Sequence, residues 1–519
     1  MHSYDLAIIV VYLVAITVFG AHFRGGQKNL RDYFLGGRTA PWWAIALSIV
    51  SAETSTLTII GTPPLAFAGN LGFLQIVLGY LLARIVISFV FLPQYFRGEM
   101  FTAYELMRRR FGERVRKLTA SIFLVTRALA EGVRVFAISL VIYIVLADFY
   151  VRFHVSPDTG EIASIVLIVL LTLFYTFEGG MTAVIWTDVV QMTLYVAGAV
   201  ASFAIILGKI PGGWAHVAAV AGAAHKLDIF DFRFAPTMEF LSIKYSFWAG
   251  IAGGCFLTTA THGTDQLMVQ RLLSARDERQ SRAALMASWV VILVQFTLFL
   301  LIGVLLWVHH ADLHLAAPAR PDRLYPEFVW NNLPPGLSGL IVAAILAAAM
   351  ANLSAALNSL ASTTVVDFYR ARARSVTDQA ALRIARLATI GWGGALLAIA
   401  IWARQSKSVL EAGLTIGSIP MGALLGVFLL GVLTRRPREG AAMVGVAAGL
   451  IIVVGIHLRT PIAFTWYVLI GTVTTFAAGL VASLFQGPAP QPPLEAAGVR
   501  EPAAGGLPHL PSRHAEPED

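Results

Sequence analysis

Long apolar runs separated by short polar connections make up most of this 519-residue chain. A helix of about 20 apolar residues crosses the roughly 30 Å hydrocarbon core of a bilayer, and each run is near or above that length. The pattern therefore predicts an all-α polytopic membrane protein. We expect thirteen transmembrane spans, at residues 4–22, 43–67, 73–96, 115–148, 161–177, 184–208, 245–268, 284–308, 336–366, 384–403, 409–433, 440–457 and 463–485.

The composition agrees with this prediction. Hydrophobic residues account for 57% of the chain and charged residues for 13%, a balance foreign to soluble globular proteins. The net charge of +8 does not indicate nucleic-acid binding, because the basic residues lie in the short connections. A single cysteine, Cys255, excludes an intrachain disulfide and a cysteine metal cluster. The first residues lack the basic region of a signal peptide, so we expect the run 4–22 to be a retained helix.

The distribution of basic residues predicts the orientation in the membrane. Connections on one face of the membrane hold 23 Lys and Arg residues, and connections on the other face hold 10. Basic connections stay in the cytoplasm. We therefore predict a multi-pass protein of the cell membrane, inner or plasma, with its N-terminus outside and its C-terminus in the cytoplasm. Residues 486–519 are rich in Pro, Ala and Gly and are predicted to form a disordered cytoplasmic tail.

The run 43–67 is polar at its centre, where a spanning helix is normally apolar. This centre reads Ser51-Ala-Glu-Thr-Ser-Thr-Leu-Thr-Ile-Ile-Gly-Thr-Pro-Pro64 and includes the carboxylate of Glu53. Backbone at membrane depth leaves the helix only where protein or a wet cavity satisfies its N–H and C=O groups. An ionisable residue at that depth indicates a functional site. We predict a discontinuous helix whose unwound turn binds a cation, a small solute or both.

The run 245–268 carries a second set of helix-weakening residues, five spans after the first. Gly253 and Gly254 are followed by the polar residues Thr258, Thr259, Thr261, His262 and Thr264. Paired interrupted spans in corresponding positions are typical of transporters built from inverted repeats. Close helix packing is the alternative explanation for small and polar residues here. The repeat interpretation divides the chain into an N-terminal extra helix with a cytoplasmic loop (1–42), a first repeat (43–208), an outer loop (209–244), a second repeat (245–433), two additional helices (434–485) and the tail (486–519).

Five stretches resemble the sodium:solute symporter family, which includes sodium/glucose, sodium/proline, sialic acid and monocarboxylate carriers. They are the segments that begin Tyr175-Thr-Phe-Glu-Gly-Gly and Ala347-Ala-Ala-Met-Ala-Asn-Leu-Ser, together with Gly263-Thr-Asp-Gln-Leu-Met-Val-Gln-Arg271, Tyr33-Phe-Leu-Gly-Gly-Arg38 and Pro41-Trp-Trp43. Along the chain, these stretches follow one another in the same order as in the family. The resemblance covers residues 30–485. It implies the leucine-transporter fold, with one helix added before the ten-helix core and two added after it.

The resemblance implies a sodium site between the broken span 43–67 and the span 336–366. The residues at the family's positions are Ser51, Thr54, Ala348, Ala351 and Asn352. Sodium prefers oxygen ligands, as calcium does. The family usually has a hydroxyl pair where this chain has Ala351 and Asn352, so only the amide carbonyl of Asn352 remains as a side-chain ligand. A second sodium site of some members matches Asp188 and Ser354, although Ala355 lacks the other hydroxyl.

Three interpretations of Glu53 remain open. Its charge can compensate for the missing hydroxyl ligands, its protonation can couple transport to protons, or it can pair with an arginine or cap the unwound backbone. The solute cavity is expected beside it, with the candidate residues Glu53, Ser55, Thr58, Gln75, Thr258, Thr261 and His262. Sugar carriers of the family have an aromatic residue in place of Thr261 and a lysine in place of Ile292, so a hexose is not favoured. His262 equally fits a hydrogen-bonded residue of the helix break.

Charged residues also occur inside the third and fourth spans. Arg127 and Glu131 are four residues apart and share one face of a helix. We expect these two residues, together with Arg84 and Arg134, to form an ion-paired structural cluster near the cytoplasmic end. A role in opening the inner gate is the alternative.

Together these features predict a secondary active transporter and not an enzyme. The chain has no phosphate-binding glycine loop, nucleophile elbow or His-Glu-x-x-His motif, so we expect an ion gradient to drive transport and expect no cofactor. We predict sodium-coupled symport of a small polar organic solute, with sodium, the solute and membrane lipid as partners. Monocarboxylates, amino acids and vitamin-like compounds fit better than hexoses. A proton-coupled or uncoupled carrier of the same fold is one alternative, and a membrane sensor or receptor without transport is another.

Overall fold

The computed structural model describes residues 3–22, 35–54, 56–97, 102–176, 181–316, 320–369, 378–405 and 409–486. All regular elements in these ranges are helices, which confirms the all-α prediction. The segment predicted to be a disordered tail lies outside the described residues, except for Gln486.

Each of the thirteen predicted spans overlaps one helix or two consecutive helices. In chain order these are α1 (Ser3–His22), α3 (Trp42–Glu53) with α4 (Thr56–Ala68), α5 (Leu74–Val86) with α6 (Leu92–Phe96), α8 (Glu113–Val145), α10 (Pro157–Thr176), α11 (Met181–Lys209), α14 (Phe247–Gly263) with α15 (Gln266–Leu273), α16 (Glu278–Asp312), α18 (Leu337–Thr363), α20 (Asp378–Ala403), α21 (Val409–Leu433), α22 (Glu439–Arg459) and α23 (Tyr467–Leu484). Among the described residues, six continuous helical stretches are long and apolar enough to cross a membrane, and the bent pair α3–α4 makes a seventh.

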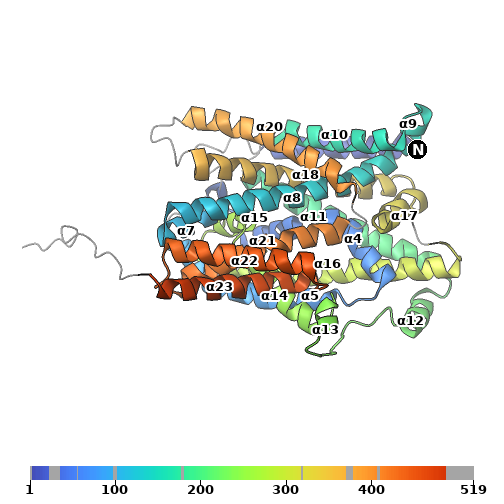
Figure 1. Ribbon diagram of the computed structural model, residues 1–519. Coiled ribbons are helices and arrows are strands. Elements are labelled where there is room, and N and C mark those ends of the chain that lie inside the picture. Colours follow the sequence, from blue (N-terminus) through green and yellow to red (C-terminus); the bar gives the residue numbers. More distant parts are fainter. Residues whose placement is uncertain are drawn as a thin grey trace, which may run out of the picture.

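Short helices lie in the connections between the spans. They are α7 (Ala103–Phe111), α9 (Ala147–Arg152), α12 (Gly213–Ala223), α13 (Met238–Ser242) and α17 (Leu324–Asn332). Figure 1 shows α7 at one end of the bundle and α9, α12 and α17 at the other. Hydrogen bonds from the backbone N–H of Arg114 to Glu439 (2.9 Å) and of Arg438 to Gln486 (3.0 Å) bring the starts of α8 and α22 and the end of α23 together. The α7 end is the one that the basic residues predict to be cytoplasmic.

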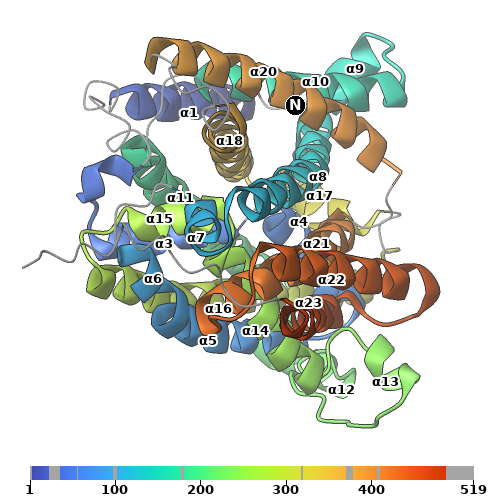
Figure 2. The same ribbon diagram turned by 60° about the vertical axis from the view of Figure 1, so that its left-hand side comes forward.

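The break between α3 and α4 lies inside the bundle. Helix α3 packs against α11 and α16, while α18 packs against α1, α8 and α11. Helices α21, α22 and α23 group on one side of the molecule (Figure 2). Thr54, the residue at the break, has no exposed surface. The packing therefore surrounds the irregular backbone with protein, as a break at membrane depth requires.

The predicted interruption of the run 43–67 is confirmed. Helix α3 ends at Glu53, and Thr54 has left the helical conformation (φ −83°, ψ 87°) before α4 begins at Thr56. The axes on the two sides differ in direction by 62°. The N–H of Thr54 bonds the Val50 carbonyl (2.7 Å) in the last turn of α3, and the carbonyls of Ser51 and Thr54 at the break face Asn352 of α18.

The second interruption, which the sequence analysis attributed to Gly253, Gly254 and the polar residues that follow them, is wrong in position for residues 253–262. Helix α14 runs unbroken through this stretch and ends at Gly263, and α15 begins at Gln266. A Cβ atom added at Gly253 would lie 2.4 Å from the carbonyl oxygen of Thr465, and one added at Gly254 would lie 2.3 Å from the carbonyl oxygen of Ile76. These glycines therefore allow close packing against neighbouring backbone, which was the alternative explanation. The actual break is at residues 264–265, where the side chain of Asp265 accepts a hydrogen bond from the N–H of Leu267 and caps α15.

Candidate cation and solute site

The carbonyl groups released at the α3–α4 break point toward α18. The side-chain nitrogen of Asn352 lies 3.4 Å from the carbonyl oxygen of Ser51 and 3.4 Å from that of Thr54. The structure therefore brings three of the five residues of the first expected sodium site together. Ala348 and Ala351 lie on the same helix, α18, but their side-chain surroundings are outside the described part of the chain.

The side chain of Thr54 contacts a residue that the sequence analysis missed. Its hydroxyl and the amide of Gln295 on α16 lie within hydrogen-bond distance, 3.0 Å from Oε1 and 2.8 Å from Nε2. Gln295 is 2% exposed, so the pair is enclosed by protein. This contact ties the break to α16. A lone glutamine inside the apolar run 284–308 was the signal that could have identified it.

Asp188, expected at the second sodium site, lies at the centre of a buried polar group. Its Oδ2 accepts hydrogen bonds from the hydroxyl of Ser48 (2.6 Å) and from Nη2 of Arg271 (3.0 Å). Among the described residues, its Oδ1 accepts one long hydrogen bond, 3.4 Å from the hydroxyl of Ser51. Ser354 is half-buried on α18, which packs against the helix α11 that carries Asp188.

Arg271 is held firmly beside this carboxylate. Its Nε donates to Ser48 at 3.0 Å and its Nη1 donates to the carbonyl of Leu267 at 3.0 Å. The side chain is 2% exposed, so Asp188 and Arg271 form an ion pair in the interior. The sequence analysis used Arg271 only as part of a family motif. Its partner could not be identified there, because the two residues are 83 positions apart.

Glu53 forms a second buried polar group with Arg84 and His262. Nη2 of Arg84 lies 2.7 Å from Glu53 Oε2, and Nε2 of His262 lies 3.3 Å from the same oxygen. The His262 contact lacks hydrogen-bond geometry, so the arginine is the principal partner. Arg84 was expected beside Arg127 near the cytoplasmic end, and this expectation is wrong. Pairing with an arginine was one of the three interpretations of Glu53.

The surroundings of this group are also polar. Arg84 has no exposed surface, and its remaining donors reach the hydroxyl of Ser288 (3.1 Å) and the carbonyl of Tyr80 (3.4 Å). Nδ1 of His262 lies 3.0 Å from the hydroxyl of Thr261. The contact between Glu53 and His262 places the end of α3 directly beside the end of α14. Glu53 and His262, both expected to line the solute cavity, therefore lie side by side.

The other expected solute residues differ in their surroundings. Thr58 and Thr258 are buried on α4 and α14. Gln75 is fully buried, and its amide bonds the carbonyls of Gly72 (3.1 Å) and Tyr245 (2.8 Å) and the N–H of Asp231 (3.0 Å). A solute at Gln75 would compete with three backbone groups. Ser55 lies outside the described residues.

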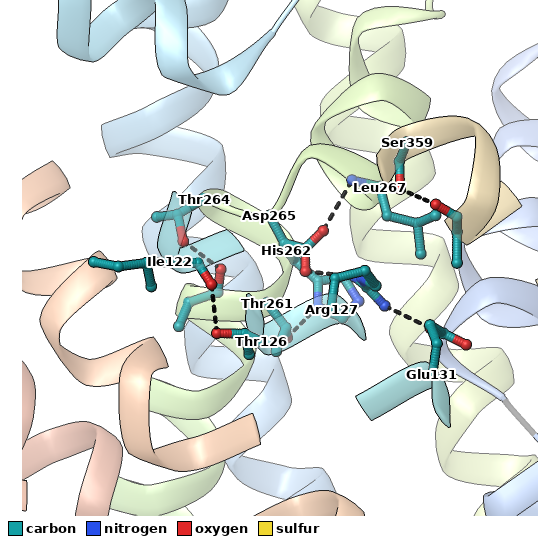
Figure 3. A network of polar contacts seen from close by, with 12 residues as sticks. Ile122, Thr126, Arg127, Glu131, Thr261, His262, Thr264, Asp265, Leu267 and Ser359 are labelled. Carbon is teal, nitrogen blue, oxygen red and sulfur yellow. Dashed lines mark hydrogen bonds and ion pairs between the residues drawn. The ribbon is translucent and has the colours of Figure 1, made fainter. Parts of the chain in front are cut away.

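The predicted ion-paired cluster on α8 is present, with one member added and one absent. Nη1 of Arg127 lies 3.0 Å from Oε1 of Glu131, and Arg134 pairs with the same carboxylate. The other side of the Arg127 guanidinium pairs with Asp265 at the α14–α15 break. Figure 3 shows Arg127 between Asp265 and Glu131. The cluster therefore ties α8 to the second helix break. Its signal was Asp265 within the motif 263–271.

This cluster and the first expected sodium site are neighbours. Glu131 and Arg134 line a crevice whose opposite wall includes Ala349, Asn352 and Leu353 of α18. The crevice has no room for a water molecule. Helices α8 and α18 are therefore closed against each other beside Asn352.

Comparison with known proteins identifies the family. A model of the "Sodium:solute symporter family" matches residues 33–449. The chain is 27% identical to a sodium/sialic acid symporter of Proteus mirabilis, over 94% of this chain and 96% of that protein. It is 27% identical to the human sodium/iodide cotransporter (86% of this chain, 68% of the relative) and 28% identical to human sodium-coupled monocarboxylate transporter 1 (85% and 70%).

Solved structures agree with this assignment. A substrate-bound, outward-open sodium-coupled sialic acid symporter has a TM-score of 0.82 at 27% identity, over 94% of this chain and 99% of that chain. A nucleobase-cation-symport-1 family transporter, 14% identical with a TM-score of 0.57, shares the fold over 88% of this chain and 95% of its own. The described protein is thus a multi-pass membrane protein with the leucine-transporter fold, a transporter and not an enzyme. It belongs to the sodium:solute symporter family.

Proposed function

We propose that this protein couples the entry of sodium to the uptake of a small polar organic solute by alternating access. Family membership supports the class of function, and relatives named for sodium-coupled transport of sialic acid, iodide and monocarboxylates support the ion. The observation that carries the proposal is the buried carboxylate of Asp188, which lies against Ser51 in the last turn before the α3–α4 break. A carboxylate at membrane depth beside unwound backbone is typical of ion-coupled transporters.

The cation is proposed to bind between Asp188 and Ser354. One oxygen of Asp188 is committed to Arg271 and Ser48, whereas the other, within the part of the chain that the structure describes, accepts one long contact from Ser51 and keeps lone pairs for a cation. Ser354 adds a hydroxyl from the adjoining helix. Carboxylate and hydroxyl oxygens are suitable ligands for a hard cation.

The solute is proposed to bind near Glu53, Arg84 and His262, between the α3–α4 break, α5 and α14. This group presents a carboxylate, a guanidinium and an imidazole inside the helix bundle. The hydroxyls of Thr58, Thr258 and Thr261 on the same helices add further polar contacts. Mixed donors and acceptors suit a small polar solute such as a monocarboxylate, an amino acid or a vitamin-like compound better than a hexose.

Coupling requires that sodium bind one state of the transporter more tightly than the other. In the proposed cycle sodium beside Asp188 favours the outward-open state and the solute then binds. A rocking movement follows, and loss of sodium to the cytoplasm releases the solute. The contact between Arg127 and Asp265 holds α8 against the α14–α15 break. Inward opening is proposed to separate these two elements.

Uptake into proteoliposomes tests the proposal. Thermal-shift screening against monocarboxylates, amino acids, vitamins and sugars, each with and without sodium, first identifies a solute. Uptake of that solute is expected to fall to the background when choline replaces sodium, and Asp188→Ala is expected to weaken its sodium dependence. Uptake that is equal in choline, or an unchanged sodium dependence of Asp188→Ala, would contradict the proposal.

A proton-coupled carrier is the second candidate, and the contact between His262 and Glu53 favours it. Imidazole and carboxylate are the side-chain groups that most often transfer protons in proteins, and here they lie 3.3 Å apart. In this case an inward proton gradient would drive uptake in choline, and a protonophore would abolish it. Sodium coupling would leave sodium-driven uptake unaffected by the protonophore in vesicles clamped at zero potential.

A further inference from the structure

We propose that the side-chain amide of Asn352 takes the place of a cation at the first expected sodium site, so that one sodium ion, beside Asp188, is coupled to transport. The first statement concerns the site alone, whereas the second rests on the proposed sodium coupling.

The hydrogen-bonding pattern of the amide carries this inference. The nitrogen of Asn352 faces two carbonyl oxygens, those of Ser51 and Thr54, each at 3.4 Å. An amide nitrogen has two N–H donors, one for each carbonyl. Without a cation between them, the opposite orientation would bring the amide oxygen against two other acceptors, which is unfavourable. The carbonyls released by the helix break are therefore satisfied by a donor that is covalently part of the protein.

Distances oppose a cation at the same place. Hard cations such as calcium hold oxygen ligands at about 2.3–2.6 Å. The nitrogen of Asn352 lies 3.4 Å from each of these two carbonyl oxygens, so a cation at the position of the nitrogen would have to draw each of them closer by about 1 Å. Alanine at position 351 offers no side-chain oxygen to complete the set. A cation here would thus lose ligands and also displace the amide.

The carboxylate on the α8 side of Asn352 does not offset this loss. Glu131, the carboxylate that lines the crevice beside Asn352, is already paired with Arg127 and Arg134. The crevice has no room for a water molecule that could supply a further oxygen ligand. Asn352 itself is 7% exposed, so bulk water does not reach the amide freely. The amide provides the link between the α3–α4 break and α18 that a cation would otherwise provide.

Equilibrium binding of radioactive sodium to the purified full-length protein tests the inference without a solute. We expect the wild type and Asn352→Ala to bind one sodium ion each. The double variant Ala351→Ser/Asn352→Ser restores the hydroxyl pair and is expected to bind two. Asn352→Asp, which keeps the shape of the side chain, replaces the donor by a charged acceptor and is also expected to gain one ion. Elution as a single species in size-exclusion chromatography controls for folding.

The outcomes separate this inference from the proposed function. Two sodium ions on the wild type, or loss of sodium from Asn352→Ala, would show that Asn352 is a ligand and would overturn the inference. A wild type without sodium, combined with one ion gained by the double variant, would refute the proposed coupling and support the amide substitution. No gain in either the double variant or Asn352→Asp would also overturn the inference. If the double variant fails to fold, Asn352→Ala and Asn352→Asp decide the question.

Discussion

The ion pair between Glu53 and Arg84 makes a quantitative prediction about stability. Glu53→Gln keeps the size of the side chain but removes the charge opposite an arginine with no exposed surface. Ser288 and the carbonyl of Tyr80 remain as neutral acceptors, and they do not compensate for a buried positive charge. Breaking one side of a buried pair costs about 3–5 kcal/mol, because the remaining charge stays away from water without a counter-charge. We expect the free energy of unfolding to fall by this amount.

Urea denaturation of the protein in detergent, followed by tryptophan fluorescence, measures this loss. The matched control is Glu105→Gln, because Glu105 and Arg108 also lie 2.7 Å apart but Arg108 is 50% exposed. An exposed pair contributes about 0–1 kcal/mol. The double variant Glu53→Gln/Arg84→Gln is expected to recover much of the stability lost by Glu53→Gln. If Glu53→Gln costs no more than Glu105→Gln, the argument from burial is refuted.

Three further predictions concern the framework around the site. Asp265→Asn is expected to cost about 3–5 kcal/mol in urea unfolding, because it leaves the single charge of Glu131 to face both Arg127 and Arg134, while asparagine can still cap α15. A cost below about 1 kcal/mol would refute the ion-pair argument. Gly254→Ala is expected to lower the free energy of unfolding by about 1–3 kcal/mol, because the new Cβ would lie 2.3 Å from the Ile76 carbonyl oxygen. Gly222→Ala is the control and should be close to neutral, because a Cβ there would have nothing within 4 Å. Equal effects would contradict the packing argument. Asp5→Ala removes the acceptor of hydrogen bonds from the N–H groups of Gly336 (2.6 Å) and Gly339 (3.0 Å) at the start of α18. These two amide hydrogens should then exchange faster with solvent, and the free energy of unfolding should fall by about 1–2 kcal/mol. Unchanged exchange would show that this cap is dispensable.

The first helix break could be predicted from the sequence because its signals are chemical. Glu53 and a cluster of hydroxyls in the middle of an apolar run are incompatible with an ordinary lipid-facing helix. The second break was misplaced because Gly253 and Gly254 were interpreted as residues that interrupt the helix. In the structure they permit contact with the carbonyls of Thr465 and Ile76, and these partners lie on distant parts of the chain. Asp265, a good N-cap, marks the true break.

The partners of the charged residues could not be predicted from sequence spacing alone. Arg127 and Glu131 pair as expected because they share one helix face. The partner of Arg84 is 31 residues away, across a helix break, and depends on how α5 packs against α3. For Asn352 the sequence predicted a weakened sodium site. The orientation of the Asn352 amide depends on the position of α18 relative to the carbonyls of Ser51 and Thr54. Only the structure provides this position.

The relation between the sodium gradient and solute accumulation tests the central claim most directly. A series of inward sodium gradients would be imposed on proteoliposomes clamped at zero membrane potential. The steady-state accumulation of the solute would be measured at each gradient. With one sodium ion per solute, a tenfold sodium gradient can concentrate the solute about tenfold, because both changes correspond to about 1.4 kcal/mol. Accumulation in proportion to the sodium gradient, lost in Asp188→Ala, is the predicted result. Accumulation with the square of the gradient would contradict the single-cation cycle, and no accumulation at any gradient would contradict sodium coupling itself.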